Sequence, residues 1–181
     1  MYKKILFILV IVTSLSASNY DDFFREYQKN NFTRACKIGK KIYSHNERDE
    51  KLLSVIGKAC LKADYISTVG TIQSRLRTTK EARVNSVIFS TVVLQKRLIY
   101  QFMYDGTDIS TLALPVFDHP LSHTFVAIRD KDYKVTSTSP KTIEFDVGDE
   151  HYKVYIDKND SGRIVIEVKD KNNKITTHRY L

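Results

Sequence analysis

The chain has 181 residues, of which 42% are hydrophobic and 28% charged, and its formal net charge is +8. This composition is typical of a folded protein rather than a disordered one, and the length allows one ordinary core or two small ones. Residues 19–104 contain 16 Lys and Arg against 8 Asp and Glu, whereas residues 105–181 contain 11 against 13. The basic half therefore favours an anionic partner.

Residues 1–18 have the organisation of a secretory signal peptide. Two lysines precede an apolar run, Ile5 to Val12, and small residues then lead to a cleavage position after Ala17 or Ser18. The apolar run is shorter than the roughly 20 residues that a membrane-spanning helix needs, so no transmembrane segment is expected in the mature chain. We therefore expect a periplasmic or secreted protein, whose partner is not nucleic acid.

Residues 19–106 are predicted to be helical, because no proline occurs in them and apolar residues recur at helical spacing. The expected helices cover about 21–30, 32–43, 49–63, 64–76 and 78–104. Thr78 and Glu81 have the spacing of a capping box at the start of the last helix. That helix is rich in β-branched and aromatic residues, so two strands or a broken helix are the alternative.

The chain contains two cysteines, Cys36 and Cys60, on the apolar faces of consecutive predicted helices. In an oxidising compartment, two cysteines with no further thiol favour one internal disulfide. Closing a loop of about 24 residues would stabilise the fold by roughly 3.5 kcal/mol. A catalytic thiol or half of a metal site is the alternative, but the chain has no C-x-x-C pattern.

Two stretches, Tyr27–Tyr43 and Leu52–Ile72, resemble tetratricopeptide-type helix hairpins. Four positions match the aromatic or small residues of the family motif: Phe32, Ala35, Gly57 and Tyr65. The resemblance covers about one and a half repeats, lacks the repeat-ending proline and has Thr68 where alanine is usual. It implies that the chain binds peptides or proteins through a groove, as a scaffold rather than a catalyst. A generic antiparallel helical bundle is the alternative.

Residues 107–123, which include Pro115 and Pro120, are predicted to be a loop. Residues 124–181 then show a hydrophobic period of two and short turns, which predict an antiparallel β-meander. The expected strands are Thr124–Arg129, Thr142–Val147, His151–Ile156, Arg163–Lys169 and Ile175–Tyr180. One face of this sheet is apolar, and we expect the long helix to cover it. The predicted fold class is α+β, with helical hairpins followed by a sheet.

The predicted helices carry basic residues that share faces or crowd one junction. The candidate binding residues are Arg34, Lys37, Lys41, Arg75, Arg77, Lys80 and Arg83. Their like charges repel by only a few tenths of a kcal/mol each, so ordinary solvated helix faces are the alternative to a binding site.

The loop Asp118–His123 contains two histidines and a carboxylate. A metal site needs three or four converging ligands, so surface histidines are favoured over a site built on His119 and His123. Asp157–Gly162 has the first oxygen ligands of a calcium loop but lacks the terminal acid, so a hairpin turn is favoured. We expect no cofactor and no metal.

These observations favour a non-catalytic, exported envelope protein of bacteria. We expect it to act as an adaptor or structural component that binds another envelope protein or an anionic envelope component. The first alternative is a small periplasmic enzyme that acts on cell-wall or peptide substrates through the Asp118–His123 loop. The second is a carrier that binds an apolar ligand on the sheet face.

Overall fold

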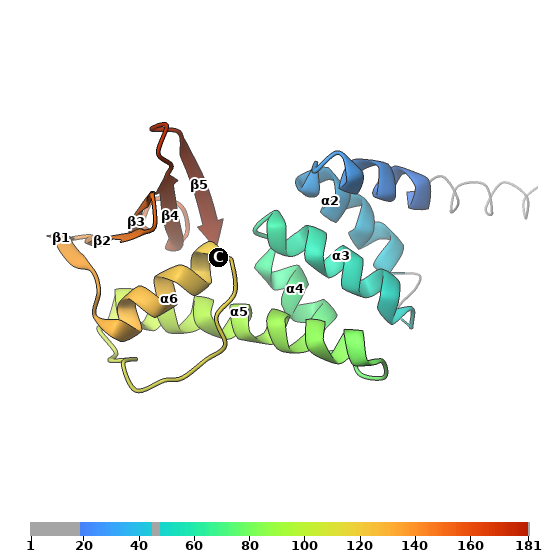
Figure 1. The fold of residues 1–181 in the computed structure, drawn as a ribbon, viewed down its shortest axis with the longest axis horizontal. Coiled ribbons are helices and arrows are strands. Elements are labelled where there is room, and N and C mark those ends of the chain that lie inside the picture. The colour runs from blue at the N-terminus through green and yellow to red at the C-terminus, as the bar shows by residue number, and fades with distance from the viewer. Residues whose placement is uncertain (1–18, 45–47, 181) are drawn as a thin grey trace, which may run out of the picture. The chain divides into compact units, whose positions relative to one another are not determined.

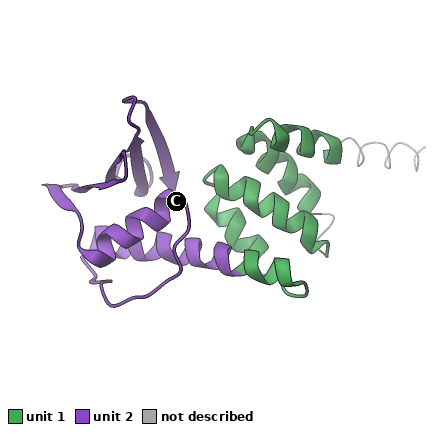
Figure 2. Ribbon diagram, in the orientation of Figure 1, with its two compact units in different colours: residues 1–86 green, residues 87–181 purple. Residues whose placement is uncertain are grey.

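The computed structural model describes residues 19–44 and 48–180 and has the predicted α+β fold, with helices followed by an antiparallel sheet (Figure 1). The predicted signal peptide, residues 1–18, lies outside the described residues. The chain divides into two compact units, residues 1–86 and 87–181 (Figure 2). Their boundary lies within the long helix α5, Lys80–Asp105, and not in the loop 107–123 that the sequence analysis placed between the two halves.

The helices of unit 1 follow the predicted pattern. Residues 19–28 are helical, and the next three helices are α2 (Phe32–Tyr43), α3 (Glu50–Lys62) and α4 (Ile66–Gln73). Asn31 and Asp49 cap α2 and α3, because each side chain accepts a hydrogen bond from a first-turn amide. The Thr78 capping box is wrong: Thr79 Oγ1 accepts from Ala82 N at 3.1 Å and caps α5 instead.

In the core of unit 1, a disulfide links helices α2 and α3. Cys36 of α2 and Cys60 of α3 form the expected disulfide, with an S–S distance of 2.07 Å, and both residues are fully buried. Gly39 lies one turn along α2, where Ile56 of α3 and Phe23 approach it closely. The absence of a side chain at Gly39 therefore lets α2 pack directly on the core.

α5 is one continuous helix of 26 residues, as predicted, despite its β-branched and aromatic residues. Phe89, Val92, Ile99 and Met103 are all at most 4% exposed and recur at intervals of 3, 7 and 4 residues. This spacing places them along one side of a helix, and burial of that side outweighs intrinsic strand propensity.

Unit 2 contains a helix where the sequence analysis expected a strand. Residues 120–130 form α6 (Pro120–Asp130), so the predicted strand Thr124–Arg129 is wrong and the predicted loop ends before position 123. Proline at the first helical position and a cap from His119 favour a helix start here. Leu121, Phe125 and Ile128 are buried at helical spacing. The run is short enough that its β-branched residues also fit a strand pattern.

The C-terminal strands form the predicted meander, in which four strands were predicted and the first was not. They are β1 (Lys134–Thr138), β2 (Lys141–Val147), β3 (Glu150–Asp157), β4 (Arg163–Lys169) and β5 (Ile175–Tyr180), in the order β1-β2-β3-β4-β5 and all antiparallel. β1 was missed because it is a mostly exposed edge strand with little apolar pattern. The segment from Asp157 to Gly162 connects β3 to β4 and forms the hairpin turn that the sequence analysis predicted.

One face of the sheet is apolar and buried, as the sequence analysis expected. Its most deeply buried members are Ile143, Val154, Ile164, Ile166 and Tyr180, each at most 1% exposed. Two helices of unit 2 contact the sheet: the Lys141 ammonium donates to Phe102 O of α5 at 3.0 Å, and His123 of α6 bonds to Tyr152 of β3. The long helix α5, which the sequence analysis expected to cover this face, therefore contacts the sheet, and so does α6.

Candidate functional site

The most organised polar site in unit 1 is the loop between α4 and α5. Glu50, the first residue of α3, accepts hydrogen bonds from the backbone N–H groups of Arg77, Thr78 and Thr79 and from the Thr78 hydroxyl, at 2.6–3.1 Å. These donors, the Arg77 amide foremost, lower the pKa of Glu50 to about 2. The carboxylate therefore stays ionised and holds the loop in one conformation.

Arginines surround this carboxylate. A cavity of about 510 Å³ is lined by Arg48, Glu50, Ser74, Arg75, Arg77 and Thr78, and we call it the arginine hollow. Three of these residues are cationic, and the one carboxylate is already bound by backbone amides. The hollow therefore presents a net positive charge, which suits an anionic group.

The arginines of the hollow are held by contacts with the chain. Arg77 Nε donates to Ser74 O at 2.7 Å, and the Arg75 guanidinium lies 5.8 Å from the centre of the Tyr43 ring. Arg83 Nη1 donates to Thr78 O at 2.7 Å and so fixes the same loop from α5. A guanidinium has five N–H groups, so an arginine that donates to one carbonyl keeps further donors for a ligand.

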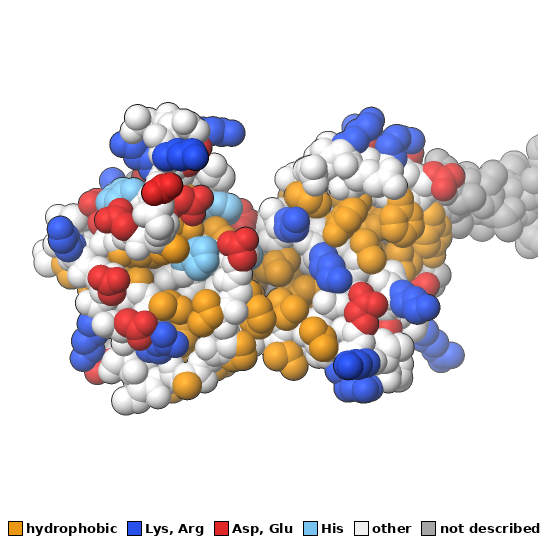
Figure 3. Space-filling view, in the orientation of Figure 1, with side chains coloured by type: hydrophobic (Ala, Val, Ile, Leu, Met, Phe, Trp, Pro, Cys, Tyr) orange, Lys and Arg blue, Asp and Glu red, His pale blue; other side chains and the backbone are white. Residues whose placement is uncertain are grey.

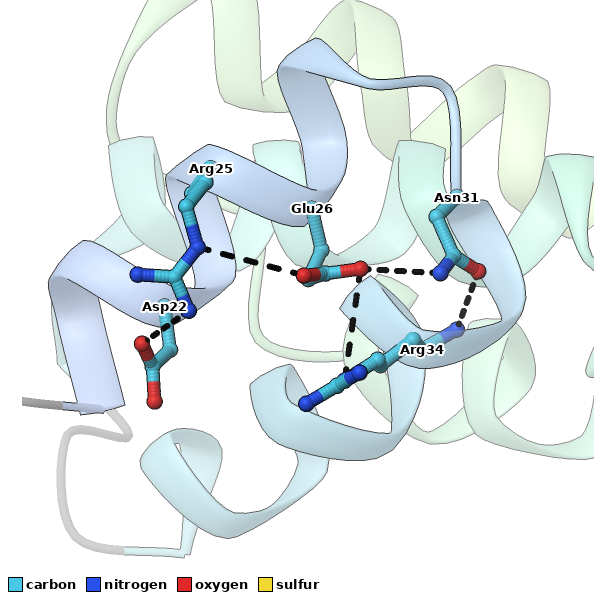
Figure 4. Close-up of polar contacts among 5 residues, drawn as sticks. All are labelled: Asp22, Arg25, Glu26, Asn31 and Arg34. Carbon is cyan, nitrogen blue, oxygen red and sulfur yellow. Dashed lines mark hydrogen bonds and ion pairs between the residues drawn. The ribbon is translucent and has the colours of Figure 1, made fainter.

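Arg34, another candidate binding residue, is not among the residues that line the hollow, and it faces a buried carboxylate (Figure 4). Glu26 is 6% exposed and accepts from Asn31 Nδ2 at 2.8 Å, while Arg25 Nε and Arg34 Nε each lie 4.0 Å from it. Asn31 also caps α2 through its other side-chain atom. This cluster connects the helical segment 19–28 to α2, so we assign Arg34 a structural role.

The remaining candidates are not among the residues that line the hollow. Lys37 and Lys41 are exposed on α2, and Lys80 is exposed at the start of α5. In the face drawn in Figure 3, Lys and Arg side chains lie at several separate places on the helical unit. The structure therefore brings together Arg75, Arg77 and Arg83 from the predicted set, and adds Arg48 and Glu50.

Sequence reasoning missed Arg48 and Glu50 because their role depends on tertiary contacts. Glu50 is 27 residues away from the nearest amide that it binds. Its position directly after the capping Asp49 is ordinary for a helix start, where acidic residues are favoured in any case. No pattern in the sequence indicates the second role of Glu50, which is to accept hydrogen bonds from a distant loop.

The two histidines at the start of α6, His119 and His123, make structural contacts. His119 is 7% exposed, and its Nδ1 accepts from Leu121 N at 3.2 Å to cap α6. His123 Nδ1 lies 2.8 Å from Tyr152 Oη, which donates to Glu150 Oε2 at 2.9 Å, and His123 Nε2 lies 3.9 Å from Asp118. Burial, and then the Glu150 carboxylate, raise the pKa of Tyr152, so its hydroxyl stays protonated and donates.

In the view of Figure 3, histidines of unit 2 lie close to acidic side chains. His151, for example, is 2.7 Å from Asp146 and 3.7 Å from Glu144 on the outer side of the sheet. Nevertheless, within residues 19–44 and 48–180 no three His, Cys, Asp or Glu side chains converge in a way that would hold a metal ion.

Comparisons with protein-family models, with curated proteins and with solved structures find no match to this chain. In the described part of the chain, no helix combines the length and the hydrophobicity required to span a bilayer.

Proposed function

We propose that this protein is a non-catalytic adaptor of the cell envelope that binds an acidic segment of another envelope protein in the arginine hollow. The observation that carries this proposal is the grouping of Arg48, Arg75 and Arg77 around one cavity whose carboxylate is already satisfied. Planar guanidinium groups match carboxylates in bidentate geometry, so glutamate and aspartate side chains suit the hollow.

The shape of the site favours a protein segment over an anionic membrane surface. A cavity of about 510 Å³ admits side chains that project from a peptide, whereas a flat lipid surface is met better by a broad, continuous basic face. The basic residues outside the hollow are distributed over separate elements, as described above. In this proposal the helix hairpins act as tetratricopeptide-like repeats that present the hollow.

Export and location outside the cytosol are part of the same proposal. The disulfide between Cys36 and Cys60 suits an oxidising compartment, and the pattern of residues 1–18 suits a cleavable signal peptide. A binding role is favoured over the enzyme alternative because His119 and His123 are both occupied with contacts inside unit 2.

The proposal is tested with a fluorescently labelled hexaglutamate peptide and the mature protein. We expect saturable binding by fluorescence anisotropy that weakens as salt is added, because the contact is ionic. The double variant Arg75→Glu/Arg77→Glu should weaken binding at least tenfold, since it replaces two attractive charges by repulsive ones. Its melting temperature should stay close to that of the wild type.

The matched control is Lys171→Glu/Lys174→Glu, which makes the same change in net charge on exposed residues of unit 2. This control should bind the peptide like the wild type. Equal loss of binding in both double variants would mean that only net charge matters, and the arginine hollow would be rejected. Binding to phosphatidylglycerol vesicles but not to the peptide would also overturn the proposal.

A further inference from the structure

The β2–β3 hairpin of unit 2 ends in an exposed acidic turn. Val147 of β2 pairs with Glu150 of β3. Only Gly148 and Asp149 lie between them, so the hairpin has a tight two-residue turn. Gly148 has a φ of +58°, a conformation that favours glycine, and a Cβ there would meet no other part of the described chain within 4 Å. Asp149 and Glu150 are both exposed, so the turn presents two adjacent carboxylates to solvent.

These two carboxylates have no cationic partner among the described residues of the chain. The Glu150 carboxylate accepts a hydrogen bond from the uncharged Tyr152 hydroxyl at 2.9 Å, and no ion pair involves either acid. Asp160, in the next hairpin turn, differs in this respect, because it is paired with Arg163 at 3.4 Å. Asp149 and Glu150 are also the only two acidic residues that are adjacent in sequence within residues 105–181. The β2–β3 turn therefore carries concentrated negative charge that its own unit does not neutralise.

The charge of this turn is opposite to that of the arginine hollow in unit 1. Three arginines line the hollow, and Glu50, its one acidic lining residue, is held by backbone amides. The two parts of the chain differ in the same sense, because residues 19–104 have 16 Lys and Arg against 8 Asp and Glu, and residues 105–181 have 11 against 13. A two-residue turn is the narrow end of a hairpin, so its acidic side chains can enter a cavity of about 510 Å³.

From this complementarity we infer that the arginine hollow of one molecule binds the β2–β3 turn of a second copy of this chain. The inference rests on the proposed function, since it requires that the hollow accepts carboxylates, and it adds a partner that the chain itself supplies. The hollow and the turn are different surfaces, so the contact is head-to-tail. Repeating such a contact produces linear chains or closed rings, of which a reciprocal dimer is the smallest. An acidic segment of another protein would compete for the same hollow.

Sedimentation equilibrium of the mature protein over a range of concentrations tests the inference. We expect the weight-average mass to rise with protein concentration and to fall when salt is added, because the contact is ionic. Arg75→Glu/Arg77→Glu blocks the hollow, and Asp149→Asn/Glu150→Gln blocks the turn while keeping side-chain size and acceptor oxygens. Each double variant by itself should have an association constant at least tenfold below that of the wild type. An equimolar mixture of the two should form a 1:1 complex and nothing larger, because each variant keeps the surface that the other has lost.

The matched control is Asp105→Asn/Asp132→Asn, which removes two negative charges from other exposed positions of unit 2 and should associate like the wild type. Hexaglutamate peptide should dissociate the wild-type assemblies, since it occupies the same hollow. A wild type that stays monomeric but binds hexaglutamate would overturn this inference and leave the proposed function standing, whereas loss of both activities would reject both. The inference is also overturned if either blocked variant associates like the wild type, or if their mixture forms no 1:1 complex.

Discussion

Gly39 allows the sharpest prediction about the core of unit 1. A Cβ at this position would lie 2.8 Å from Ile56 Cγ2, 3.0 Å from Ile56 Cγ1 and 3.2 Å from Phe23 Cε2. Ile56 and Phe23 are both fully buried, so neither side chain can move into solvent. Overpacking a core costs about 1–3 kcal/mol, and three short contacts put Gly39→Ala near the upper end of that range. Replacing a helical glycine by alanine returns about 1 kcal/mol.

The expected net effect of Gly39→Ala is therefore a loss of about 2 kcal/mol in the free energy of unfolding. Ile56→Ala by itself should cost about 2–5 kcal/mol, because it leaves a cavity. In the Ile56→Ala background the two closest atoms are gone, so Gly39→Ala should be neutral or stabilising by up to about 1 kcal/mol. The double-mutant cycle should then show a coupling of about 2–3 kcal/mol.

Urea unfolding followed by far-ultraviolet circular dichroism measures all four members of this cycle. Leu53→Ala is the matched control, since Leu53 is equally buried on α3 and provides none of the three atoms that would lie nearest to a Cβ at position 39. Gly39→Ala should remain destabilising in that background. If Gly39→Ala has the same effect in the wild-type, Ile56→Ala and Leu53→Ala backgrounds, the close approach of α2 to Ile56 is refuted.

Two further predictions concern unit 1. Replacing Cys36 and Cys60 together by alanine should lower the free energy of unfolding by about 3.5 kcal/mol, because the disulfide spans 24 residues. Adding a reductant to the wild type should have a similar effect in urea titrations. Two titratable thiols in the non-reduced mature protein would contradict the bond. Glu50 has a lowered pKa, so its stabilising effect should be complete above the ordinary value of 4.5 and lost as the pH falls through about 2. Glu50→Gln should lower the melting temperature at neutral pH and flatten its decline in that acidic range, and an unchanged pH profile would argue against this role.

The fold was predictable where one local pattern dominates. Helical spacing located α2 and α3 in unit 1, and alternation located β4 and β5 with the observed bounds. The strand predicted at Thr124–Arg129 was wrong because a short β-branched run fits both periods, and the decision came from burial of α6 and its cap from His119. Edge strand β1 was missed for the opposite reason: it buries almost nothing, so its sequence carries no alternation.

The candidate site was predictable only in part. Arg75, Arg77 and Arg83 are close in sequence, so their clustering could be read directly. Arg34 was predicted as a binding residue because it shares a helix face with Lys37 and Lys41, and the structure places it beside Glu26. Arg48 and Glu50 joined the site only when α3 and the loop before α5 came together. Contacts between residues far apart in sequence have no local signature, so charge patterns by themselves overstate some residues and omit others.

The sequence by itself determined that helices precede a meander of strands, and it determined the pairing of the two cysteines, because hydrophobic period and the number of thiols can be read without knowing the fold. Tertiary structure alone decided that Gly39 meets Ile56 and that Glu50 binds a loop 27 residues away along the chain. These features arise from close packing between elements, where the position of each side chain depends on all of its neighbours.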